Sequence, residues 1–158
     1  LHFFEVNVLS GVRLSRHYLP RMLDQNWGRI IFISSESGIQ IPAEMVHYGT
    51  TKTAQLGVSR GLAQQTAGTN VTVNTVIPGS TRSEGSEKFI SDLAQERGLS
   101  KEDVEREFFE KIRPTSLLER FATIDEVATF VTYLASPLAA ANNGAALRVD
   151  GGTVSTIL

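Results

Sequence analysis

The stretch Gly28-Arg29-Ile30-Ile31-Phe32-Ile33-Ser34-Ser35 decides how the rest of this chain is interpreted. It is a short apolar run with three isoleucines and a phenylalanine, bounded by a glycine and by serines. Such a run is typical of a β-strand that is buried on both faces, as in a parallel sheet. A sheet of that kind needs helices over its faces, so the neighbouring segments should be helical.

The segments on either side repeat this pattern of strand and helix. Helical spacing of apolar residues predicts one helix before the stretch and a second after it, the latter with Ala54, Val58 and Leu62 in one row. Strands separated by crossover helices indicate a parallel α/β sheet. The expected elements are helices at 6–25, 47–66 and 123–135, strands at 29–34, 71–77 and 145–149, and a charged, two-part helical segment at 82–113.

Composition limits the classes of function. The 158 residues carry 15 Lys+Arg against 17 Asp+Glu and no cysteine, and 41% of them are hydrophobic, as in an ordinary globular domain. Thiolate metal sites, disulfides and a cysteine nucleophile are excluded. The balanced charge argues against nucleic acid or an anionic membrane as the main partner. Apolar runs are far shorter than the roughly 20 residues that span a bilayer, and we expect a cytoplasmic protein.

Ser35, Tyr48 and Lys52 form the strongest chemical candidate. Tyr48 and Lys52 are one helical turn apart and share a face, so an ammonium would lower the phenol pKa toward the working range. Ser35 follows a predicted strand, at the sheet edge where ligands bind in open α/β sheets. Taken alone, the Tyr-x-x-x-Lys spacing fits a solvated tyrosine and an exposed lysine better, because such a pair occurs by chance on many helices.

The sequence as a whole resembles the carboxyl-terminal portion of proteins of the short-chain dehydrogenase/reductase family. The resemblance rests on the order and spacing of several motifs over nearly the whole chain. These are Asn7-Val8-x-x-Gly11, Leu19-Pro20-x-Met22, Gly28 to Ser35 followed by Gly38, Tyr48-Gly49-x-x-Lys52, Val73-Asn74-x-x-x-Pro78-Gly79 and Val149-Asp150-Gly151-Gly152. The fold it implies is a partial Rossmann-like, doubly wound parallel sheet comprising the last three strands and their flanking helices.

The resemblance implies a hydride transfer between nicotinamide and a secondary alcohol or ketone. Tyr48 would be the general acid/base, Lys52 would lower its pKa and bind the nicotinamide ribose, and Ser35 would orient the substrate oxygen. Asn7 would shape its helix to hold a water of the proton relay. The residues expected at the cofactor are Tyr48, Lys52, Pro78, Gly79, Thr81 and Ser83, the last standing where the family often has threonine.

The family's Gly-rich phosphate-binding turn is absent from these 158 residues. We therefore interpret residues 1–158 as the catalytic portion of one longer domain, with 82–113 as a lid. NAD and NADP both remain open as cofactor, and binding by these residues alone should be weak or absent. The first strand should have an open edge. The alternative is a non-catalytic assembly module that forms a homo-oligomer through helices 7–24 and 47–66.

The remaining conspicuous side chains give weaker evidence of function, and several fit a structural role. His2, His17 and His47 lack partners at metal-ligand spacing, so no metal site is predicted. Ser34 fits a strand-end hydrogen bond. Glu36 could face substrate, and the phenylalanines of the lid could contact substrate or pack in the core.

Overall fold

The computed structural model describes residues 1–157, and Leu158, the last residue of the predicted portion 1–158, lies outside the described residues. Its three strands are β1 (Gly28–Ile33), β2 (Val71–Pro78) and β3 (Ala146–Val149). They form one parallel sheet in the order β1-β2-β3, with Ile31 of β1 opposite Asn74 and Val76 of β2 opposite Leu147. The predicted α/β class is confirmed.

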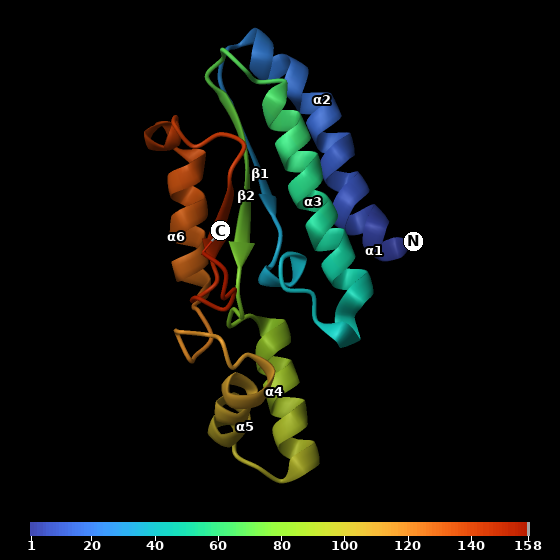
Figure 1. Cartoon of the computed structure of the whole chain (residues 1–158), viewed down its shortest axis with the longest axis vertical. Coiled ribbons are helices and arrows are strands. Elements are labelled where there is room, and N and C mark those ends of the chain that lie inside the picture. The colour runs from blue at the N-terminus through green and yellow to red at the C-terminus, as the bar shows by residue number, and fades with distance from the viewer. Residues whose placement is uncertain (158) are drawn as a thin grey trace.

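Helices cover both faces of this sheet. The chain begins with α1 (His2–Phe4), a π-helical turn (Glu5–Leu9) and α2 (Ser10–Asp24), which follow one another without a break. Figure 1 shows α2 beside α3 (Val46–Gln64) on one face and α6 (Ile124–Ala135) on the other. The first helix was predicted to begin at residue 6; it begins at residue 2 and contains the π-helical turn.

Burial differs between the strands because they occupy different places in the sheet. Every residue from Val71 to Ile77 in central β2 is buried. In β1, which pairs only with β2 among the described residues, Ile33 is 43% exposed and residues 29–31 are half-buried. The prediction that 29–34 is buried on both faces is therefore wrong for residues 29–31 and 33, and it holds for Phe32 and Ser34.

The buried row of α3 is not the apolar row. Val58 and Leu62 are only half-buried and pack beside the Phe32 cluster. The most buried positions are Thr51, Gln55, Ser59 and Ala63. Two of these side chains hydrogen-bond to Asn7 in the π-helical turn, so this face of α3 meets the start of the chain through polar contacts.

The predicted lid segment has a small core of its own. Helices α4 (Glu84–Arg97) and α5 (Lys101–Glu107), then a π-helical turn (Phe108–Ile112), lie together at one end of the molecule (Figure 1). Phe109 is buried there against Ile90, Val104 and Phe121, whereas Phe89 is 47% exposed. Packing inside the segment therefore accounts for Phe109 without a substrate contact.

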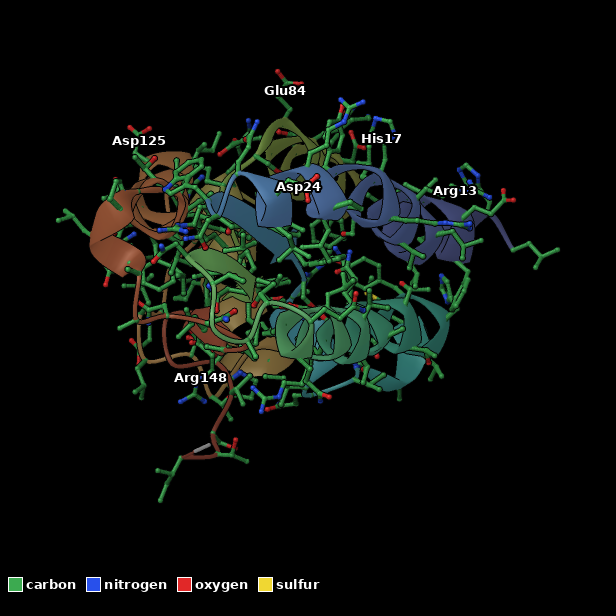
Figure 2. The ribbon with its side chains drawn as sticks, turned by 90° about the horizontal axis from the view of Figure 1, so that it is seen from above. Arg13, His17, Asp24, Glu84, Asp125 and Arg148 are labelled. Carbon is green, nitrogen blue, oxygen red and sulfur yellow. The ribbon has the colours of Figure 1, made fainter. Side chains whose placement is uncertain are left out.

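The surface of the helical layers is polar at the labelled positions. In Figure 2 the side chains of Arg13, His17 and Asp24 project outward from α2, and that of Asp125 projects from the start of α6. Among residues 1–157, no helix is long and apolar enough to cross a membrane.

Candidate active site

Ser34 and Ser35 follow β1 directly, at the carboxyl edge of the sheet. The Ser34 amide continues the β1–β2 pairing by donating to the Val76 carbonyl at 2.8 Å, and its hydroxyl donates to the Lys52 carbonyl at 2.8 Å. Gly38 allows this close approach, because a Cβ there would lie 2.9 Å from the Lys52 carbonyl carbon. Ser34 therefore fastens α3 to the strand end.

Ser35 is buried and already engaged in hydrogen bonds. Its hydroxyl donates to Glu36 Oε2 at 2.5 Å and accepts from the Ser37 amide at 3.1 Å. Ser35 also acts on the Tyr48 phenol, whose pKa it lowers in part. The structure thus brings Ser35, Glu36 and Tyr48 into one group.

Lys52 lies one turn along α3 from Tyr48. Its Nζ is 5.6 Å from the centroid of the Tyr48 ring and donates to the Ile33 carbonyl at 2.9 Å. Burial lowers the pKa of the Lys52 ammonium. Chain geometry therefore places a cation beside the phenol, as the spacing predicted.

The direction of the Tyr48 pKa differs from the expectation. Burial raises the pKa of Tyr48, Ser35 lowers it in part, and the negative charge of Glu36 raises it further. The predicted lowering by Lys52 is not found, because the phenol is half-buried beside a carboxylate and the ammonium is directed to a backbone carbonyl.

Asn7 lies in the π-helical turn and connects this turn to α3 through hydrogen bonds. Its Nδ2 donates to Thr51 Oγ1 at 2.9 Å, and Thr51 Oγ1 donates to the Tyr48 carbonyl at 2.7 Å. The Asn7 carbonyl accepts from Gln55 Nε2 at 2.6 Å. Single π-helical turns often occur at functional sites. Gln55 was not predicted as a residue of the site. The sequence gives no signal for it, because only the fold shows that its row on α3 is buried.

Sequence reasoning also missed Arg113 as the partner of Glu36. Arg113 Nε donates to Glu36 Oε1 at 3.0 Å, and the two side chains are only 16% and 8% exposed. The guanidinium carbon of Arg113 also lies 5.9 Å from the centroid of the Phe108 ring. The two residues are 77 positions apart, so no local spacing could have paired them.

The ends of β2 and β3 place the remaining predicted residues. Pro78 ends β2, and the Gly79 amide donates to the Val149 carbonyl at 3.1 Å. A Cβ on Gly79 would lie 2.6 Å from the Asp150 carbonyl oxygen, so packing alone requires a glycine there. Thr81 Oγ1 donates to the Gly79 carbonyl at 3.0 Å.

Ser83 stands apart from this group. Its hydroxyl accepts from the Ser86 amide, and the Ser86 hydroxyl in turn accepts from the Ser83 amide, as the capping box of α4. Helix capping thus already accounts for a hydroxyl at position 83. Among the described residues, no three His, Cys, Asp or Glu side chains are grouped as metal ligands.

Comparison with known proteins assigns the family. A family model described as enoyl-(acyl carrier protein) reductase matches residues 1–154. The uncharacterized oxidoreductase YvaG of Bacillus subtilis is 52% identical over 155 residues, which are 98% of this chain and 59% of the relative. The D-beta-hydroxybutyrate dehydrogenase of Rhizobium meliloti is 35% identical over 93% of this chain and 56% of its own length.

A solved structure agrees with these sequence matches. The L-sorbose reductase of Gluconobacter frateurii, complexed with NADPH and L-sorbose, matches with a TM-score of 0.90 and 28% identity. The match covers 98% of this chain and 58% of that chain. This chain therefore spans little more than half the length of the relatives that it matches. It belongs to the short-chain dehydrogenase/reductase family, of which it represents the carboxyl-terminal portion.

Proposed function

We propose that the protein carrying this sequence is a nicotinamide-dependent oxidoreductase that interconverts a secondary alcohol and a ketone. The observation that carries the proposal is the grouping of Ser35 with Tyr48, with the Lys52 Nζ 5.6 Å from the centroid of the Tyr48 ring. Family membership and the sequence relatives that are named as oxidoreductases support it.

Each of the three side chains has a distinct task in this proposal. Tyr48 donates its phenolic proton to the carbonyl oxygen in reduction and accepts the alcohol proton in oxidation. The pKa of Tyr48 is raised, so the phenol is protonated at neutral pH, as reduction requires, but the higher pKa also makes it a weaker acid. Ser35 hydrogen-bonds the same substrate oxygen, for which its hydroxyl hydrogen must turn away from Glu36.

The donors at this edge fit the nicotinamide end of a dinucleotide. An ammonium has three N–H donors, and among the described residues Lys52 uses one of them, on the Ile33 carbonyl. The remaining donors suit ribose hydroxyls, and Pro78, Gly79 and Thr81 lie at the same edge of the sheet. The cofactor, NAD or NADP, supplies or accepts the hydride.

A tyrosine variant tests this proposal in the complete protein. Tyr48→Phe should lower kcat for ketone reduction by about 10²–10⁴-fold, the usual contribution of a positioned acid. Tyr133→Phe is the matched control, because Tyr133 is 41% exposed and its hydroxyl donates to Asn142 Oδ1 at 3.0 Å, in a part of the chain without assigned chemistry. Wild-type turnover by Tyr48→Phe would remove the assigned mechanism.

Residues 1–158 by themselves should bind a dinucleotide weakly or not at all. They contain no Gly-rich turn that could place backbone N–H groups around the pyrophosphate. Titration calorimetry with NADH and with NADPH measures this directly. Micromolar affinity for either cofactor would show that the phosphates have another site in these residues.

The second candidate function is assembly without catalysis. An apolar groove of about 370 Å3 lies between α2 and α3, lined among others by Val12, Leu19 and Leu62. On the exposed surface of α2, Leu14 is 59% and Tyr18 49% exposed. Such a surface suits a homo-oligomer built from α2 and α3, because exposed apolar patches mark protein contacts.

Sedimentation equilibrium of the complete protein tests the oligomer. Leu14→Glu should weaken association at least tenfold if α2 is the interface. Leu138→Glu is the control, because Leu138 is 83% exposed after α6, on the other side of the sheet. An oligomer that lacks hydride transfer would favour the assembly function over catalysis. Equal association by both variants would exclude the α2 surface.

A further inference from the structure

We infer that the site beside Ser35 accepts an uncharged polar substrate and discriminates against one with a carboxylate near its ketone. The inference rests on the proposed function, because it names the substrate class of that same site. It depends on the Glu36–Arg113 ion pair, whose carboxylate also accepts the Ser35 hydroxyl.

Both oxygens of Glu36 are occupied. Oε2 accepts the Ser35 hydroxyl at 2.5 Å, and Oε1 accepts from Arg113 Nε at 3.0 Å. The Glu36 side chain is 8% exposed and that of Arg113 is 16% exposed, so water screens the pair only weakly. Arg113 therefore has its counter-ion within the protein before any substrate arrives.

The pair borders a cavity of about 200 Å3 between the loop that precedes α3 and the end of the lid segment. Its charged groups are two carboxylates, Glu36 and Glu44, against the single guanidinium of Arg113, so its formal charge is negative. The amide of Gln40 adds hydrogen-bond donors and an acceptor. The remaining lining residues are Ile41, Pro42, Ile112 and Thr153.

The cavity reaches the reacting groups through Glu36, which accepts the Ser35 hydroxyl, so we take it to hold the part of the substrate next to the ketone. A carboxylate on that part of the substrate would meet an unfavourable choice. It could displace Glu36 from Arg113 and leave a buried carboxylate unpaired beside Ser35, or it could stay unpaired itself. Leaving one partner of a buried pair uncompensated corresponds to about a 100-fold loss or more in binding. A hydroxyl group pays no such penalty, since it can both donate to a carboxylate and accept from an amide.

A matched pair of ketones tests the inference in the complete protein with NADH or NADPH. 4-Hydroxybutan-2-one and 3-oxobutanoate share the ketone and differ in a terminal hydroxymethyl against a carboxylate. We expect kcat/KM to favour the hydroxyketone by about 100-fold or more. If another ketone proves to be the better substrate, its analogue with a terminal carboxylate in place of hydroxymethyl gives the comparison.

Two variants assign the discrimination to the ion pair. Glu36→Gln frees the Arg113 charge and should reduce the preference for the hydroxyketone at least tenfold, whatever it does to the overall rate. Glu44→Gln is the matched control, because Glu44 is an exposed carboxylate on the same cavity, and it should change the preference less than threefold.

The outcomes separate the two proposals. A wild-type preference for the keto acid overturns the substrate class while hydride transfer stands, and this measurement needs no variant. An unchanged preference in an active Glu36→Gln protein overturns the role of the pair. Failure to reduce any ketone of a panel overturns the proposed function itself, and the substrate class with it.

Discussion

Breaking the Glu36–Arg113 pair from either side should destabilise the fold, whereas removing both partners together should cost little. With side-chain exposures of 8% and 16%, each partner is largely desolvated. Loss of one partner of a buried pair typically costs about 3–5 kcal/mol. Glu36→Gln keeps an acceptor for Ser35, so we expect about 3 kcal/mol for it. Arg113→Met leaves a buried carboxylate and belongs nearer the upper value.

The double variant Glu36→Gln/Arg113→Met distinguishes pairing from packing. Replacement of a buried pair by uncharged groups is often neutral, so its stability should lie within about 2 kcal/mol of wild type. The two single effects should therefore fail to add by about 3 kcal/mol or more. Loss of the Arg113 contact with the Phe108 ring appears in both variants that lack Arg113 and cancels from the cycle.

Equilibrium unfolding in urea, followed by circular dichroism, measures the cycle. With a slope of about 2 kcal/mol/M, a loss of 3 kcal/mol lowers the midpoint by about 1.5 M. Asp92→Asn is the control: it breaks the Lys88–Asp92 pair, whose side chains are 76% and 62% exposed, and should cost at most about 0.5 kcal/mol. Additive single effects in the buried pair would refute the reasoning, because they would mean that solvent screens it.

Two further predictions concern the same sheet edge. Gly79→Ala places a Cβ 2.6 Å from a backbone oxygen and should lower the free energy of unfolding by about 1–3 kcal/mol, measured in a thermal melt. Gly85→Ala in α4 is the control: the nearest atom is 3.8 Å away, and the variant should gain up to about 1 kcal/mol of stability. Equal melting shifts in the two variants would contradict the clash. Glu36→Gln removes a negative charge that raises the pKa of Tyr48, so the pKa should fall and the tyrosinate absorbance should appear at lower pH than in wild type. A titration that stays in place or moves upward would show that burial alone sets the pKa.

The sequence predicted the features that depend on neighbours along the chain. The apolar periodicity that predicts helices is local, and the structure has helices in each of the segments predicted to be helical. The position of Ser35 at a strand end and the single turn between Tyr48 and Lys52 are local as well. These are the parts of the candidate site that could be placed without coordinates of the fold.

The features that the sequence did not predict depend on which parts of the chain pack against one another in the fold. The half-burial of residues 29–31 and the exposure of Ile33 depend on what packs against the faces of β1, which no pattern inside 28–33 can reveal. In α3 the row at 54, 58 and 62 is only half-buried, with Val58 and Leu62 beside the Phe32 cluster, and the fully buried row is mostly polar. Thr51 Oγ1 and Gln55 Nε2 hydrogen-bond to Asn7 there, whereas Gln55 Oε1 is buried without a partner among the described residues. The Tyr48 pKa was expected to fall because Lys52 is near in sequence, and it rises because the fold buries the ring next to Glu36.

Three features of the site depend on the single carboxylate of Glu36. It accepts the Ser35 hydroxyl, it raises the pKa of Tyr48, and it holds Arg113 at the end of the lid segment. Arg113, which stands at the end of the predicted lid segment, pairs with the same carboxylate that raises the pKa of Tyr48. Through Glu36 that segment therefore contacts the group that includes the proposed acid–base residue.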